Sequence, residues 1–121
     1  MKHTGIFALL GVLSLSVAPA RAQPAGEAVF KKNCAICHTV EAGKNKIGPA
    51  LSGIVGRKAG TISGFNYSAA NNSSGATWDE QTLDTYLIAP QKFIPGTKMV
   101  FVGLPNPEDR KALIAYLKEQ H

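Results

Sequence analysis

The residues with the clearest chemical potential are two cysteines and a histidine, which lie together as Cys34-Ala35-Ile36-Cys37-His38. Two thiols three positions apart can each add to one of the two vinyl groups of a haem, and the imidazole of the next residue is then held below the iron. The chain contains two cysteines in all, so this pentapeptide accounts for both. The spacing indicates covalent attachment of haem.

Three other chemistries use closely spaced cysteines, and the sequence supports each of them less well. A structural zinc ion takes four ligands, but beyond the cysteines and His38 the chain after residue 22 offers only His121 at its end. A thioredoxin-like redox pair is expected within a strand–helix–strand pattern, which the loop-rich sequence does not show. A plain disulfide would leave His38 and the long loops without a role.

Residues 1–22 are typical of a secretory signal peptide: a charged start, an apolar stretch over residues 6–17 and small residues that form an export cleavage site. The apolar stretch is shorter than the roughly 20 residues that an uncleaved membrane anchor needs. A mitochondrial transit peptide would contain more arginine. We expect cleavage after Ala22, with Ala20 as the alternative, and export of residues 23–121 to the bacterial periplasm.

Removal of the signal leaves Met99 as the only methionine. It follows Pro95 and Gly96, which keep its segment out of a helix. A single methionine is most often a gap-filling core residue, but a thioether near an open haem face would bind the iron and raise its reduction potential, because it favours the ferrous state. We therefore predict His38 and Met99 as the two axial ligands. Such a centre has no vacancy for oxygen or peroxide and is restricted to electron transfer.

The composition fits one globular domain built around these groups. A chain of 121 residues has room for a single core. Hydrophobic residues make up 45% of the sequence, which excludes a disordered chain. Charged residues make up 17%, with a net charge of +5, which is too mild for a nucleic-acid-binding arm.

Two helices are predicted in the second half of the chain. Thr77 and Glu80 form a capping-box pattern with Thr77 as the N-cap, and this helix ends before Pro90 because a residue preceding proline is pushed out of the helical region. Asn106 and Pro107 suit the N-cap and first position of a last helix, which runs to residue 118. Apolar residues recur at helical spacing in both helices and are expected to face the core: Leu83, Tyr86, Leu87, Leu113, Ile114, Tyr116 and Leu117.

A first helix is predicted from residue 24 to the cysteine pair, and a long segment without regular periodicity follows it. Residues 39–76 are rich in Gly, Asn and Ser. A loop of that length is uncommon in a compact domain, but it is expected if the chain wraps a group that is not protein. The predicted fold class is therefore all-α, with three main helices and long Ω-type loops around one covalent haem.

Several short segments of the chain together resemble a known family: residues 34–41, 47–51, 53–58, 64–67, 86–87, 94–99 and 113–118. They are similar to class I cytochrome c, in its soluble mitochondrial-like bacterial branch, and the last two match almost letter for letter. The resemblance covers residues 24–119 and implies a cytochrome c domain over residues 23–121. It also implies that Gly26 and Phe30 pack the first helix against the last.

The resemblance implies further contacts around the haem. The carbonyl of Pro49 would accept a hydrogen bond from the imidazole of His38 and fix its orientation. Tyr67 and Trp78 would hydrogen-bond a haem propionate, with Arg57 nearby to offset its charge. A third group would surround an internal water near the axial sulfur: Asn71, Tyr86 and Thr97.

The function implied by the resemblance is that of a periplasmic electron carrier, not an enzyme, with one haem c attached through Cys34 and Cys37. Its partners would be membrane redox complexes, such as a quinol–cytochrome c reductase and a terminal oxidase or photosynthetic reaction centre. It would act as a monomer, touch the membrane only transiently and bind no nucleic acid. The alternative is a haem peroxidase or gas-binding haem protein with an open distal site.

The charge pattern departs from that of the family's mitochondrial members, which ring the exposed haem edge with lysines. Asn33, Gln91, Pro105 and Asn106 lie where that ring would have basic residues or next to them. The lysines that remain are Lys31, Lys32, Lys44, Lys46, Lys92 and Lys98. This looser positive face would still steer an acidic partner and make association sensitive to salt.

Overall fold

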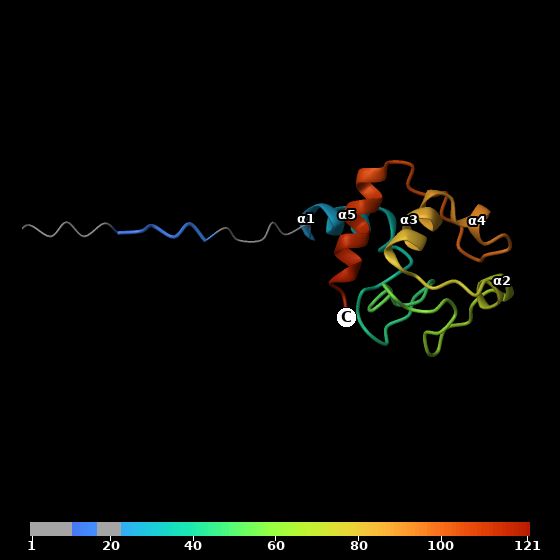
Figure 1. The fold of residues 1–121 in the computed structure, drawn as a ribbon. Helices are drawn as coiled ribbons and strands as arrows, with labels where there is room; N and C mark the ends of the chain where they lie inside the picture. The colour runs from blue at the N-terminus through green and yellow to red at the C-terminus, as the bar shows by residue number, and fades with distance from the viewer. Residues whose placement is uncertain (1–10, 17–22) are drawn as a thin grey trace, which may run out of the picture.

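A computed structural model describes residues 11–16 and 23–121 (Figure 1). Within these ranges the helices are α1 (Gln23–Asn33), α2 (Ala69–Ser73), α3 (Glu80–Ile88), α4 (Pro90–Phe93) and α5 (Pro107–Lys118). The described chain has no β-strand, and its one isolated antiparallel bridge joins Lys58 to Thr77. The all-α prediction with three main helices is confirmed, with α1, α3 and α5 as those helices.

The predicted signal peptide lies largely outside the described residues. Of its length only residues 11–16 are described, and they are exposed and without regular secondary structure. Both candidate cleavage sites lie outside the described part, so the boundary at residue 22 stays a prediction. Among the helices that are described, none combines the length and the apolar character needed to cross a membrane.

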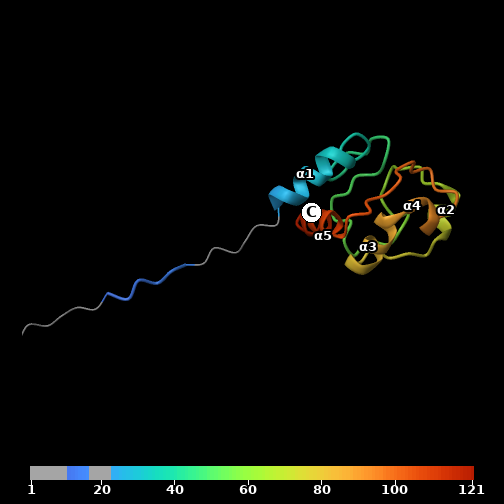
Figure 2. The same cartoon turned by 90° about the horizontal axis from the view of Figure 1, so that it is seen from above.

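The first and last helices pack closely against each other, side by side in both views (Figures 1 and 2). A Cβ atom on Gly26 would lie 2.1 Å from the carbonyl oxygen of Ala112, so only glycine permits this approach. One turn later the ring of Phe30 lies 5.6 Å from that of Tyr116, and Leu113 is completely buried. The predicted packing of α1 against α5 is confirmed.

Helix α3 begins two residues later than the sequence predicted, and Thr77 is not its N-cap. The N-cap is Asp79, whose Oδ1 accepts a hydrogen bond of 2.7 Å from the N–H of Thr82. This bond lowers the pKa of Asp79, since the charged carboxylate is the better acceptor at a helix N-terminus. Thr77 is held in the antiparallel bridge, and the N–H of Trp78 donates to the carbonyl of Arg57 at 2.8 Å. These long-range bonds keep the segment extended.

The remaining boundaries follow local sequence signals. Pro90 both ends α3 and starts the short helix α4, because its missing N–H is tolerated in the first turn. Asn106 caps α5 as predicted, and its Oδ1 accepts the N–H groups of Glu108 at 2.9 Å and Asp109 at 3.4 Å. Helix α2 was not predicted within residues 39–76, because a five-residue helix is too short to show a periodic pattern.

We predict that Gly26→Ala destabilises the protein by about 1–3 kcal/mol, because its methyl group would overlap the backbone of α5. Helix propensity alone predicts that this substitution would stabilise the protein, because alanine is favoured over glycine in a helix by roughly 1 kcal/mol. The measurement is the free energy of unfolding from denaturant titration of the haem-loaded protein. Ala28→Gly at an exposed position of the same helix is the control for propensity. A Gly26→Ala variant as stable as the parent would contradict the prediction.

Candidate haem site

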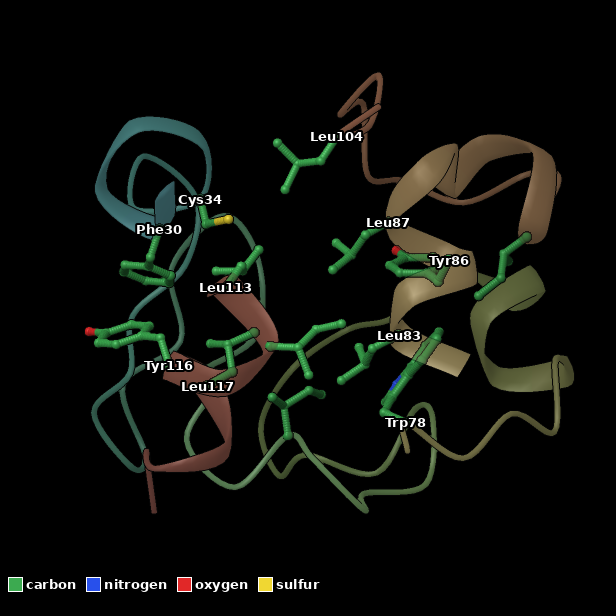
Figure 3. Close-up of a cluster of buried hydrophobic side chains, with 13 residues drawn as sticks. Phe30, Cys34, Trp78, Leu83, Tyr86, Leu87, Leu104, Leu113, Tyr116 and Leu117 are labelled. Carbon is green, nitrogen blue, oxygen red and sulfur yellow. The ribbon is translucent and has the colours of Figure 1, made fainter. Parts of the chain in front are cut away.

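A cavity of about 360 Å³ lies at the centre of the domain, between α1 and α5 on one side and α3 on the other. Protein interiors rarely contain voids larger than a few water molecules, and ligand pockets range over roughly 300–1,000 Å³. Figure 3 shows the buried side chains of α1 and α5 separated from those of α3, with Leu104 on the far edge. The centre of this fold is therefore shaped for a ligand.

The site residues predicted from the sequence all line this one cavity: Cys34, Cys37, His38, Pro49, Arg57, Tyr67, Asn71, Trp78, Tyr86, Thr97 and Met99. They come from the end of α1, from the loop after it, from α2, from α3 and from the segment that follows α4. Residues more than sixty positions apart in the chain thus meet around the same space.

The cysteine wall of the cavity is an extension of α1. The N–H of Cys34 donates to the carbonyl of Phe30 at 2.8 Å, and the N–H of His38 donates to the carbonyl of Cys34 at 2.9 Å. The two cysteines form no disulfide with each other. Burial, with a smaller contribution from Cys37, raises the pKa of the Cys34 thiol to about 11. The two thiols and the imidazole are thus presented on one tight turn.

The imidazole of His38 is oriented by its surroundings. Its Nδ1 lies 2.7 Å from the carbonyl oxygen of Pro49, and because a carbonyl only accepts, Nδ1 carries the hydrogen and Nε2 keeps its lone pair. Burial lowers the pKa of His38 more than this hydrogen bond raises it, and Lys46 lowers it slightly further. A Cβ atom on Gly48 would lie 2.3 Å from Cε1 of His38, so the ring rests directly against this glycine.

Met99 lines the cavity from the segment that follows α4, and its sulfur is held by a hydrogen bond. The hydroxyl of Tyr86 donates to Sδ of Met99 at 3.0 Å, and the N–H of Met99 donates to Oγ1 of Thr97 at 3.2 Å. Burial raises the pKa of Tyr86 to about 12, so its hydroxyl remains a donor at neutral pH. The ring of Tyr86 is itself fixed by Trp78, with centroids 4.6 Å apart.

The polar residues at the cavity wall differ in how far their hydrogen bonds are satisfied. The guanidinium of Arg57 donates to the carbonyls of Ala50, at 3.1 Å, and of Ser52. The hydroxyl of Tyr67 accepts the N–H of Ile62 at 3.2 Å and still has its own proton to donate.

Asn71 carries the one buried side-chain polar atom without a partner in the described part of the chain. This atom is its Oδ1, an acceptor. Leaving such a group unpaired costs about 1–3 kcal/mol, so a donor is expected beside it. An internal water near the methionine sulfur, as the family resemblance implies, would supply that donor.

Three contacts near the site were not predicted from the sequence, although Lys46 was named there as part of the positive face. Gly48 supports the imidazole, Lys46 donates from Nζ to the carbonyl of Ala35 at 2.7 Å, and Arg110 is buried on α5. Only Arg110 had a detectable signal, because it falls in the helical register of the buried apolar stripe. The other two depend on contacts across the loop after α1.

Comparison with known proteins agrees with this geometry. The model of the family "Cytochrome c" matches residues 24–121. The chain belongs to the cytochrome c family. A cytochrome c of Cannabis sativa is 53% identical over 107 residues, covering 88% of this chain and 96% of that protein. Cytochrome c2 iso-2 of Magnetospirillum molischianum is 62% identical over 85 residues, covering 70% of this chain and 88% of that protein.

The fold comparison leads to the same family. The structure of cytochrome cH from Methylobacterium extorquens superposes with a TM-score of 0.73 at 46% sequence identity, covering 78% of this chain and 95% of that one. This protein is therefore a class I cytochrome c, an electron carrier with one covalent haem c attached through Cys34 and Cys37. A peroxidase function is not favoured by these relatives.

We predict that Gly48→Ala displaces the His38 imidazole and costs about 1–3 kcal/mol of stability. The backbone of Gly48 does not have a positive φ, so an alanine would be tolerated there but for the ring. The measurements are denaturant unfolding and circular dichroism in the haem absorption region of the purified holoprotein. Gly43→Ala in the same loop is the control, because its φ of 77° adds backbone strain but no atom lies within 4 Å. An unchanged haem dichroism in Gly48→Ala would refute the steric argument.

Proposed function

We propose that this cytochrome c is a periplasmic carrier whose iron is bound by His38 and Met99, and that it shuttles single electrons between membrane redox complexes. The observation that supports this is that two separately restrained donors line the same cavity. The imidazole is oriented by the carbonyl of Pro49, and the thioether by the hydroxyl of Tyr86.

The haem, when bound, supplies a single iron centre that exchanges one electron, and imidazole and thioether ligands together raise its reduction potential. The chain supplies the environment. His38 offers a neutral Nε2, because its Nδ1 proton is held by Pro49. The Tyr86 hydroxyl withdraws electron density from the sulfur of Met99, which disfavours the ferric state further.

The same arrangement argues against an open distal site. A peroxidase or gas-binding protein needs one iron face free for its ligand. Here Met99 lines the cavity in a loop and its sulfur is already oriented by Tyr86, so the sixth position would be filled from within the chain.

Electron exchange requires that the haem edge come close to a partner, and the cavity has an exposed apolar rim. We call Ile36, Ile47 and Val100 the mouth patch, because each lines the cavity while remaining 77%, 76% and 81% exposed. Scattered exposed apolar residues need no explanation, but a cluster at the opening of a binding site suits a transient contact. We propose that redox partners dock over this patch.

The charges around the cavity favour an acidic partner. Among the described residues that line the cavity there is no aspartate or glutamate, whereas Lys98 is one of them and Lys46 binds the carbonyl beside Ile36. Acidic residues instead line a groove between α3 and α5, where Asp84 pairs with Arg110 and Glu80 with Lys118, and Glu108 and Lys111 complete the charged lining. This separation of charge would orient the protein as it approaches.

Two of the six lysines of the predicted positive face are already paired. Lys31 lies 3.0 Å from Glu27, and Lys44 lies 2.6 Å from Glu41. Such exposed pairs add little stability, but each reduces the local positive charge. Of the four lysines that remain, Lys98 lines the cavity and Lys46 binds the carbonyl beside Ile36. We therefore assign the steering role chiefly to Lys46 and Lys98.

We predict that Met99→Ala converts the site into an open one. The ferrous variant should bind carbon monoxide, which the parent protein excludes. Its reduction potential should fall by at least roughly 60 mV, a tenfold change in the one-electron equilibrium. Carbon monoxide titration and potentiometry provide the measurements, with Val100→Ala, an exposed neighbour, as the control. If the parent protein binds carbon monoxide as readily as the variant, Met99 is not the sixth ligand.

A second prediction concerns docking. The rate at which a membrane-bound bacterial quinol–cytochrome c reductase reduces the protein should fall about tenfold at low salt when Lys46 and Lys98 are both changed to alanine. The rate should also lose most of its dependence on ionic strength. A single Lys111→Ala change, in the groove between α3 and α5, should have little effect. Equal rates for these variants at every salt concentration would show that the lysines near the cavity do not steer the partner.

A further inference from the structure

Arg110 is a buried charge that does not line the haem cavity. Its side chain is 9% exposed, and burying a guanidinium is costly unless its donors are satisfied. Its Nε donates to Oδ1 of Asp84 on α3 at 2.8 Å. Its Nη1 donates to the carbonyls of Leu104 and Pro105, each at 2.9 Å. The residue therefore joins α5, α3 and the segment that follows Met99.

The segment bound by Arg110 is also held against α3. The N–H of Leu104 donates to the carbonyl of Leu87 at 2.7 Å. A Cβ atom on Gly103 would lie 2.0 Å from the carbonyl oxygen of Ile88, so this backbone lies directly on the end of α3. We call residues 95–102 the Met99 loop. Residues 103–105, with their bonds to Arg110, are its downstream anchor.

The chain between Met99 and the downstream anchor has few other restraints. Val100 and Val102 are 81% and 86% exposed, and Phe101 is only partly buried. On the other side of Met99 the chain is secured at Ile94, which is buried and whose N–H donates to the carbonyl of Pro90 at 2.9 Å. A loop with so few buried contacts opens at low cost unless its ends are fixed.

We infer that Arg110 is a positioning residue for Met99: it fixes the downstream end of the loop and thereby keeps the thioether over the cavity. The inference rests on the proposed axial role of Met99. Asp84 binds Nε and sets the orientation of the guanidinium, so that Nη1 reaches both carbonyls while Nε is held at α3. Lysine has the charge but not the planar fork, and it would restore the anchor only in part.

The experiment compares purified holoproteins of the parent, Arg110→Ala and Arg110→Lys, with added imidazole as a probe of the sixth position. In Arg110→Ala the sulfur-to-iron charge-transfer band of the oxidised protein should weaken. The affinity for imidazole should rise about tenfold, since bonds from a charged donor to the loop are lost. Arg110→Lys should lie between the parent and Arg110→Ala.

A matched control separates positioning from general stability. Ile114→Ala removes buried volume from the same helix, and Ile114 lines the groove between α3 and α5, away from the Met99 loop. Even where Ile114→Ala lowers the free energy of unfolding as much as Arg110→Ala does, it should leave the sulfur-to-iron band and the affinity for imidazole unchanged. If Ile114→Ala weakens the band as much as Arg110→Ala, or if Arg110→Ala leaves the band intact, the inference is wrong.

The remaining outcomes are also decisive. If Arg110→Ala does not yield folded protein, the same two measurements are made on Arg110→Lys. A sulfur-to-iron band and an imidazole affinity equal to those of the parent in that variant overturn the inference. Absence of the sulfur band from the parent protein would overturn the axial assignment of Met99 and this inference together. A normal band in the parent with no response to Arg110 would overturn the positioning role alone.

Discussion

The constraint on which the rest of the structure depends is that the side chains of this protein do not fill its own centre. Helices α1 and α5 pack closely, down to backbone contact at Gly26, and α3 contacts α5 through Asp84 and Arg110, but a cavity of about 360 Å³ remains between the three helices. The apolar side chains of its walls, such as Leu83, Leu87 and Leu113, are buried from solvent but face this space, so a haem there would give them packing partners. A group that is not protein at the centre also accounts for the long loop between α1 and α2, which wraps the cavity.

The two proposed iron ligands are restrained in different ways. His38 is held by its own neighbourhood in sequence, through Pro49 and Gly48, so its orientation is set as soon as one loop folds over the cysteine turn. Met99 is held by Tyr86 on α3 and, through the downstream anchor, by Arg110 on α5. The orientation of the imidazole is therefore set by residues nearby in the sequence. The position of the thioether depends instead on how the Met99 loop, α3 and α5 pack together.

The surface proposed for partner docking is formed by the same segments that carry His38 and Met99. The exposed apolar residues around the cavity come from the cysteine turn, the loop after it and the Met99 loop, so the face proposed for partners is made by the same segments that carry the proposed iron ligands. Acidic side chains gather instead between α3 and α5. The proposed docking face is thus apolar around the cavity opening, and the lysines beside it would provide orientation and not tight binding.

The cysteine–histidine turn, the Asn106 cap and the place of Met99 at the cavity could be predicted from the sequence because each depends on residue types within a few positions or on a unique side chain. The remaining site residues were predicted through the resemblance to a family, and the structure shows that all of them line one cavity. Tertiary contacts decided the rest. Thr77 lost its capping role because bonds to the chain at Arg57 and Lys58 kept it extended, and Arg110 became an anchor because distant carbonyls of the Met99 loop face it. Local patterns specify helices and ligand chemistry, whereas partners far along the chain, brought close only by folding, decide where a helix starts and what a buried charge does.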